Sequence, residues 1–157
     1  MKKPKKSASQ TLRKKKAAGQ KTFELMLRSD PKEIRKMEDF LQSVNEVARL
    51  DDGTMYRLLV AGTEAVNNAI LHANKSDPAK HAYVCCILKD KRFVLKVRDE
   101  GSGFDPSSVP NPIEEKNLLK TSGRGIFLMR SLMDDVKFKV TKKGTEVELV
   151  INLKLLN

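Results

Sequence analysis

The 157-residue chain lacks the features of several common protein classes. No apolar run approaches the roughly 20 residues that a membrane-spanning helix needs, and the N-terminus shows no signal-peptide pattern. Cysteine is rare: the only two, Cys85 and Cys86, are adjacent in a strand-like pattern. Neighbours on a strand point to opposite faces, so we expect neither a disulfide nor a shared metal between them. These absences favour one cytoplasmic domain with its own hydrophobic core and no membrane contact.

Acidic residues are missing from the first 21 positions, which hold nine of the 31 lysines and arginines. Large apolar residues are also scarce there, so we expect residues 1–21 to be a disordered basic arm. The rest of the chain, 22–157, holds 22 basic and 20 acidic residues and is almost neutral. The arm is either a solvated tail without a specific role or a contact for an acidic partner or nucleic acid. A basic nucleic-acid-binding surface on the folded part is not indicated.

Hydrophobic periodicity predicts an α+β domain over residues 22–157. The expected strands are 22–28, 81–88, 92–98, 136–140 and 145–153, and the expected helices are about 31–50, 56–72 and 125–133. Their order fits a two-layer α/β sandwich, with an antiparallel or mixed, mostly antiparallel sheet and helices on one face. The connection 105–121 contains three prolines and is longer than an ordinary loop, which favours a functional segment.

Three polar motifs lie at the ends of these predicted elements. The first, Glu64 to Ala69 (Glu-Ala-Val-Asn-Asn-Ala), lies on the second helix and places Glu64 and Asn68 one turn apart. The second, Asp99 to Gly103 (Asp-Glu-Gly-Ser-Gly), follows a strand, and its glycines let the backbone approach a ligand closely. The third, Ser122 to Gly125 (Ser-Gly-Arg-Gly), opens the last helix, where free backbone N–H groups suit a phosphate.

The glycine-rich second motif does not fit two other well-known binding loops. It fails as an EF-hand, because Gly101 and Gly103 stand where calcium ligands are needed and Pro110 replaces the bidentate glutamate. A Walker loop is excluded, because the chain contains no Gly-x4-Gly-Lys-Ser/Thr sequence.

The three motifs, in this order and spacing, resemble the N, G1 and G2 boxes of the Bergerat ATP-binding fold. Gyrase-type ATPases, histidine kinases and bacterial anti-sigma-factor kinases share that fold. The sequences Glu-Ala-Val-x-Asn-Ala and Gly-Arg-Gly-Ile-Phe-Leu-Met most resemble the anti-sigma-factor serine/threonine protein kinases, over about residues 22–153. The chain departs from that family after His72, where Ala73 and Asn74 follow although the family often has glycine next.

The residues of the motifs have an expected role in binding ATP or ADP with Mg²⁺. The amide oxygen of Asn68 can coordinate Mg²⁺ without adding charge, and Glu64 can accept a proton from a nucleophile that approaches the γ-phosphate. By the resemblance, Asp99 takes the adenine amino group and the connection 105–121 is an ATP lid. The other residues expected to contact the nucleotide are Gly101, Gly103, Lys120, Gly123, Arg124, Gly125 and Thr145.

The resemblance implies a kinase that phosphorylates a serine or threonine of an anti-sigma-factor antagonist and also sequesters a sigma factor. The family commonly forms homodimers. The alternative is a nucleotide-binding regulatory module that sequesters a partner protein without phosphoryl transfer. A gyrase-like or chaperone ATPase would need further domains, and a nucleic-acid-binding protein would depend on the arm. Glu64 favours the kinase over a histidine kinase, because histidine kinases usually carry asparagine at that position.

Overall fold

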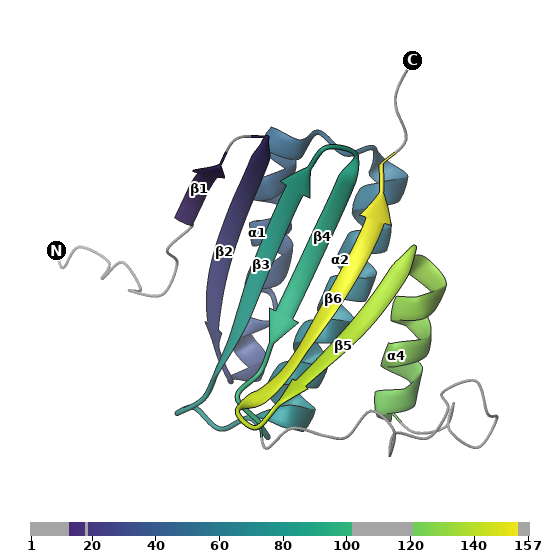
Figure 1. The fold of residues 1–157 in the computed structure, drawn as a ribbon. Helices are drawn as coiled ribbons and strands as arrows, with labels where there is room; N and C mark the ends of the chain where they lie inside the picture. The colour runs from purple at the N-terminus through teal and green to yellow at the C-terminus, as the bar shows by residue number, and fades with distance from the viewer. Residues whose placement is uncertain (1–12, 18, 102–120, 154–157) are drawn as a thin grey trace, which may run out of the picture.

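The computed structural model describes residues 13–17, 19–101 and 121–153. In these ranges the chain forms an α+β fold of two layers, one sheet with helices against one of its faces (Figure 1). The strands are β1 (Arg13–Ala17), β2 (Gln20–Arg28), β3 (His81–Lys89), β4 (Arg92–Arg98), β5 (Asp135–Thr141) and β6 (Gly144–Asn152). The helices are the 3₁₀ turn η1 (Pro31–Glu33), α1 (Lys36–Ala48), α2 (Asp52–Asn67), the π-helical turn η2 (Asn68–Ala73) and α4 (Thr121–Leu132). None of the described helices is long and apolar enough to cross a membrane.

The sheet has six strands in the order β1-β2-β3-β4-β6-β5, and the described pairings are all antiparallel. Of the two arrangements that the sequence leaves open, the antiparallel one is therefore found. Because β6 pairs with β4, the start of β6 lies beside the end of β4 (Figure 1). That pairing brings Thr145 to Asp99 across 46 residues of sequence.

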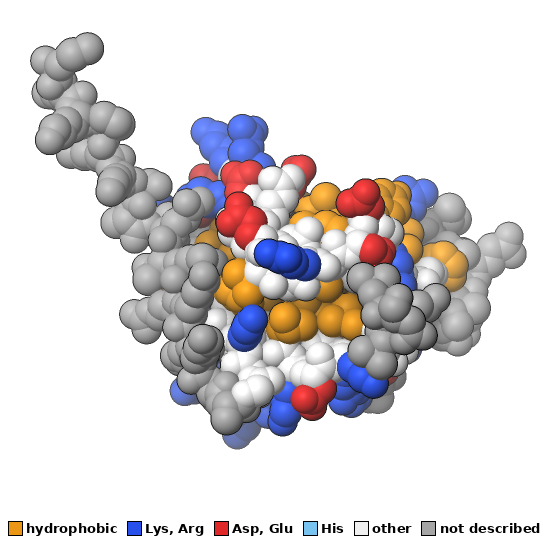
Figure 2. Space-filling model, turned by 90° about the horizontal axis from the view of Figure 1, so that it is seen from above, with side chains coloured by type: hydrophobic (Ala, Val, Ile, Leu, Met, Phe, Trp, Pro, Cys, Tyr) orange, Lys and Arg blue, Asp and Glu red, His pale blue; other side chains and the backbone are white. Residues whose placement is uncertain are grey.

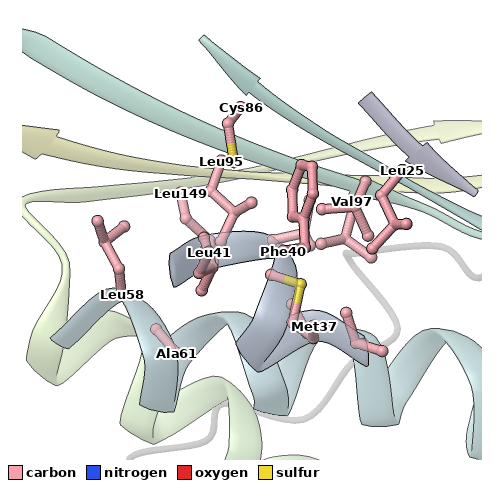
Figure 3. Packing of buried hydrophobic residues seen from close by; sticks show 14 of the residues in the cluster. Leu25, Met37, Phe40, Leu41, Leu58, Ala61, Cys86, Leu95, Val97 and Leu149 are labelled. Carbon is pink, nitrogen blue, oxygen red and sulfur yellow. The ribbon is translucent and has the colours of Figure 1, made fainter. Parts of the chain in front are cut away.

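The core lies between the inner face of the sheet and the helices (Figure 3). Strand alternation turns Cys86, Leu95 and Leu149, from three neighbouring strands, toward the helices. Met37 of α1 and Leu58 of α2 fill the space from the other side, and both are fully buried. Cys86 forms no disulfide with its neighbour in the chain, as the alternation predicts.

The edge strand β1 differs from the disordered arm predicted for residues 1–21. Arg13–Ala17 pairs with β2 in antiparallel register, so that Lys14 lies opposite Phe23. Strand pairing satisfies backbone N–H and C=O groups whatever the side chains are, and a composition rich in lysine does not prevent it at a sheet edge. The arm remains a prediction for residues 1–12, which lie outside the described residues.

Helix α2 and the turn after it differ at both ends from the helix predicted over 56–72. The helix begins at Asp52 because the Asp51 carboxylate caps it, accepting hydrogen bonds from the Thr54 N–H (2.8 Å) and hydroxyl (2.9 Å). From Asn68 onward the chain widens into the π-helical turn η2. Such turns are rare and often occur at functional sites, and this one begins at the predicted magnesium ligand.

Helix α4 begins at Thr121, before Gly123 and Gly125, whereas the sequence predicts a helix over 125–133. The two glycines therefore lie within its first two turns. The free N–H groups of an α-helix are its first four, so Gly125 is not among the N–H groups that can bind a phosphate there. Glycine at position 125 allows α4 to pack closely on α2, because a Cβ there would lie 2.9 Å from Glu64 Oε2.

The end of the fold where β3 ends and α2 begins has a mixed surface. Seen from above in Figure 2, hydrophobic side chains lie between scattered lysine, arginine and acidic side chains. The polar motifs lie at the opposite end, where β4 ends and β6 begins (Figure 1).

Candidate nucleotide-binding site

Asp99 follows β4, and its carboxylate is held in a buried position with 6 % of the residue exposed. Its Oδ1 accepts hydrogen bonds from the backbone N–H groups of Gly101 and Thr145, both at 3.0 Å. Burial raises the pKa of this carboxyl above its usual value, and the two N–H donors act against that rise. A buried acceptor with fixed orientation is suited to a hydrogen-bond donor on a ligand.

Thr145 carries a buried polar atom without a partner. The residue is 5 % exposed, and its Oγ1 has no hydrogen-bond partner among the described residues. An unsatisfied buried hydroxyl costs on the order of 1–3 kcal/mol, so native structures seldom keep one without a reason. Its position next to Asp99 indicates a polar ligand at this place.

Two glycines lie where the backbone around Asp99 leaves no room for a side chain. A Cβ on Gly101 would lie 2.7 Å from the carbonyl oxygen of Ala73, and a Cβ on Gly144 would overlap the carbonyl oxygen of Asp99. Gly144 also has a φ of +150°, which other residues rarely adopt. Gly144 is the first residue of β6, and only the structure shows that it touches the site.

Glu64 and Asn68 face Gly125 across the contact between α2 and α4. A Cβ on Gly125 would lie 2.9 Å from Glu64 Oε2 and 3.4 Å from Asn68 Nδ2. Both side chains are partly exposed, so a ligand can reach them. The first and third motifs, far apart in sequence, therefore meet in the fold.

Asn74 is a buried residue of this region that we did not predict. Its side chain is fully buried; Nδ2 donates to Ser29 Oγ at 2.8 Å and to the His81 carbonyl at 3.0 Å, while Oδ1 accepts from the Glu100 N–H at 2.9 Å. The available signal was the departure after His72, where asparagine stands near the end of the helix. Sequence alone does not show that the amide is buried.

Of the remaining residues that the sequence predicts for the site, some lie outside the described residues and others lie on α4. Gly103 and Lys120 lie outside the described residues, as does most of the predicted lid. Gly123 lies in the first turn of α4, and Arg124 is exposed on the same helix. The turn η2 joins the two described halves of the site, since Asn68 at its start faces Gly125 and its end packs against Gly101.

The comparisons with known proteins show the family of the chain. The family model described as histidine kinase-like ATPase domain matches residues 27–151. The chain belongs to this family. It is 34 % identical to the anti-sigma F factor of Anoxybacillus flavithermus over 107 residues, which cover 66 % of this chain and 72 % of that protein. It is 30 % identical to the serine-protein kinase RsbW of Listeria monocytogenes over 86 residues, covering 51 % of this chain and 55 % of that protein.

Two solved structures share the fold of this histidine kinase-like domain. The RsbU and RsbW domains of Rv1364c from Mycobacterium tuberculosis match with a TM-score of 0.61 and 16 % identity, over 84 % of this chain and 32 % of that chain. The histidine kinase domain of Erythrobacter litoralis EL346 matches with a TM-score of 0.50 and 16 % identity, over 76 % of this chain and 60 % of that chain. These structures support the fold, and the sequence relatives confirm the resemblance to the anti-sigma-factor kinases.

Proposed function

We propose that the protein is an ATP-dependent serine/threonine protein kinase and anti-sigma factor. It phosphorylates a serine or threonine of an anti-sigma-factor antagonist and sequesters a sigma factor. The observation that supports this most is the meeting of Glu64 and Asn68 at Gly125, in a chain similar to proteins named anti-sigma F factor and serine-protein kinase RsbW.

The Asp99 end of the site fits the adenine of ATP or ADP. The buried carboxylate accepts a hydrogen bond from the adenine amino group, and the unpaired hydroxyl of Thr145 gains a partner on the same ligand. Glycine at position 101 lets the backbone after Asp99 pack against the carbonyl of Ala73 at the end of η2. Toward the phosphates, the residues that we assign are Gly103, Lys120, Gly123 and Arg124. Gly125, which lies past the free N–H groups of α4, belongs to the site because it lets α4 lie close to Glu64 and Asn68.

Asn68 is the side chain that we assign to Mg²⁺. Among the described residues no three His, Cys, Asp or Glu side chains form a cluster that could hold a metal by themselves. Mg²⁺ is commonly held by one or two protein oxygens together with substrate phosphates and water, so a single amide oxygen fits this use. When bound, the ion would neutralise charge on the phosphates.

Glu64 is the residue that we assign to the proton of the reaction. The substrate hydroxyl oxygen forms a bond to the γ-phosphorus, the bond from that phosphorus to the β–γ bridging oxygen breaks, and ADP leaves. The hydroxyl proton passes to the Glu64 carboxylate, which is partly exposed and lies one helical turn before Asn68. Positioning and charge stabilisation supply the rest of such a reaction.

The partners follow from the same proposal. They are the antagonist as substrate, a sigma factor, and a second copy of the chain in a homodimer, while the basic N-terminal segment contacts an acidic partner or nucleic acid. The test is phosphoryl transfer from γ-labelled ATP to antagonist domains encoded in the same genome. Binding of a sigma factor without any transfer would favour the alternative, a regulatory module that holds nucleotide and sequesters its partner.

A further inference from the structure

Asn74 stands between the two halves of the site, and neither half as assigned above uses it. We infer that Asn74 is a positioning residue, which fixes the turn from Asp99 to Gly101 against the end of the helix that carries Asn68. The inference rests on the proposed function, since the position of Asp99 matters only if its carboxylate receives the nucleotide's amino group.

The side chain of Asn74 connects three separate segments. Its amide nitrogen donates to Ser29 Oγ after β2 and to the His81 carbonyl at the start of β3, at 2.8 and 3.0 Å. Its amide oxygen accepts from the N–H of Glu100, the residue between Asp99 and Gly101, at 2.9 Å. Three good hydrogen bonds on one fully buried amide determine its orientation.

The backbone around Asn74 is also fixed. Its own N–H donates to the carbonyl of Ala69 at 2.9 Å, closing the π-helical turn, and its carbonyl accepts from Asp77 at 3.0 Å. The next two residues, Lys75 and Ser76, have φ values of 52° and 54°, in the left-handed region that is costly for side chains other than glycine. These two residues come directly after Asn74, whose side-chain amide is turned toward the Glu100 N–H.

The hydrogen bond between Asn74 and the Glu100 N–H holds the backbone of the turn from Asp99 to Gly101, and a second hydrogen bond holds a side chain of the same turn. Tyr83, whose ring lies 4.3 Å from the Arg98 guanidinium, donates its hydroxyl hydrogen to Glu100 Oε1 at 2.6 Å. That bond restrains the side chain of Glu100, whereas the bond from Asn74 restrains the backbone that leads to the Asp99 carboxylate. Loss of the Asn74 side chain therefore displaces the Asp99 carboxylate more directly than loss of the Tyr83 side chain does.

A purely structural asparagine would change stability without changing what the site selects. The distinguishing readout is the preference for ATP over inosine triphosphate, which carries an oxygen in place of the adenine amino group. A site that hydrogen-bonds a ligand's N–H discriminates strongly against an analogue that lacks it. A displaced Asp99 carboxylate loses that discrimination even if the phosphates still bind.

The experiment compares Asn74→Ala with Asn45→Ala in the full chain, by calorimetric affinities for ATP and inosine triphosphate. Asn45 is the matched control, because its Oδ1 accepts from the Leu50 N–H at 2.7 Å at the end of α1, away from the motifs. We expect the preference for ATP to fall by about tenfold or more in Asn74→Ala, as for loss of one good hydrogen bond, and to stay unchanged in Asn45→Ala. An unchanged preference in Asn74→Ala would overturn the inference.

A second variant guards against misfolding of Asn74→Ala. Ser29→Ala removes one anchor of the Asn74 amide and keeps the bond to Glu100, so a smaller loss of preference in the same direction is expected. An unchanged preference in Ser29→Ala, with Asn74→Ala unfolded, would count against the inference. A wild-type protein that does not prefer ATP would overturn the proposed adenine site, and with it this inference.

Discussion

Asp99 and Thr145 hold each other through two hydrogen bonds of 3.0 Å: the Asp99 N–H donates to the Thr145 carbonyl, and the Thr145 N–H donates to Asp99 Oδ1. The end of β4 and the start of β6 therefore form one structural unit. The two side chains that we assign to adenine are fixed relative to each other by backbone, before any ligand arrives. Such preorganisation lowers the entropic cost of binding.

The first prediction concerns Asp99→Asn. The amide oxygen can still accept from Gly101 and Thr145, and the cost of burying a charge disappears, so the melting temperature without ligand should not fall. ATP affinity should fall by about ten- to hundredfold, the range for a hydrogen bond to a charged group. Isothermal calorimetry and the melting shift with ATP measure both effects, and Asp134→Asn, distant from the motifs, is the control.

The pH profile gives an independent check of the Asp99 assignment. Burial raises the pKa of its carboxyl, so the protonated form is favoured in the folded state and appears at a higher pH than in an ordinary aspartate. The contribution of Asp99 to the free energy of unfolding therefore grows as the pH falls. ATP affinity decreases over the same pH range, because the protonated carboxyl is a poorer acceptor for the adenine amino group. Equal acid profiles for the wild type and Asp99→Asn would contradict the role of this carboxylate.

The second prediction compares Thr145→Val with Thr145→Ser. Valine removes a hydroxyl that has no partner among the described residues, so the free energy of unfolding should change little or rise. ATP affinity should fall several-fold in Thr145→Val and stay near the wild-type value in Thr145→Ser, which keeps the hydroxyl. Equal ATP affinities for the two variants would show that the hydroxyl does not meet the nucleotide.

The third prediction is that Gly125→Ala impairs transfer more than folding. The added methyl group would lie 2.9 Å from Glu64 Oε2 and 3.4 Å from Asn68 Nδ2, and those two side chains must move to admit it. Phosphoryl transfer should fall at least tenfold, on the order of the effect of misplacing a reacting group by about an ångström. Circular dichroism measures stability in the same samples.

The matched control for Gly125→Ala is Gly53→Ala. Gly53 is exposed in the first turn of α2, where alanine gains up to about 1 kcal/mol of helix propensity while its Cβ would lie 3.3 Å from the capping Asp51 Oδ1. Stability should therefore change little, and transfer should stay unchanged. If Gly125→Ala transferred phosphate at the wild-type rate, the contact between the first and third motifs would have no part in the reaction.

The periodic elements of the fold could be predicted from sequence because their side-chain pattern is decided locally. Residues 92–98 were predicted as a strand, and β4 spans Arg92–Arg98, with Phe93, Leu95 and Val97 buried in alternation. The pairing of Glu64 and Asn68 on one helix face was likewise visible from their spacing. A period of two or of 3.6 is a property of neighbouring residues, so sequence reveals it.

Features that depend on long-range contacts could not be predicted in this way. The apolar spacing of a regular helix continues through Ile70, so nothing in it signals the π-helical turn η2. The burial of Asn74 needs Ser29 and Glu100 around it. Strand β1 forms because β2 offers a free edge, which composition does not record.

The fourth prediction concerns the basic N-terminal segment. If residues 1–12 bind polyanions, affinity for a short duplex DNA should fall linearly with log salt concentration. Deleting 1–12 leaves β1 paired with β2, so ATP affinity should be unchanged while DNA binding is strongly reduced. A full-length variant with Lys2, Lys3, Lys5 and Lys6 changed to glutamine tests charge at constant length. DNA binding that ignores salt, or survives both changes, would mean that the segment is not the contact.

The last prediction concerns the chemistry at Glu64. Glu64→Gln keeps the shape of the side chain and removes its ability to take a proton, so ATP affinity should be preserved. Transfer to the antagonist should fall by roughly 10²–10⁴-fold, the usual contribution of a general base. Asn68→Ala should instead lose Mg²⁺-dependent nucleotide binding and transfer together, since it removes the assigned metal ligand. Single-turnover transfer from γ-labelled ATP measures the rate, and Mg²⁺ titration measures binding.

The comparison of Glu64→Gln with Asn68→Ala distinguishes the role of the proton acceptor from that of the metal ligand. Glu46→Gln is the matched control, because Glu46 is exposed on α1 and should leave both binding and transfer unchanged. A wild-type transfer rate in Glu64→Gln would show that another group takes the proton, while a loss of ATP affinity in that variant would mean that Glu64 binds nucleotide. If Asn68→Ala kept its Mg²⁺ dependence, the ion would be held by phosphates and water alone, and Glu64 would have to act without a metal ligand one turn away.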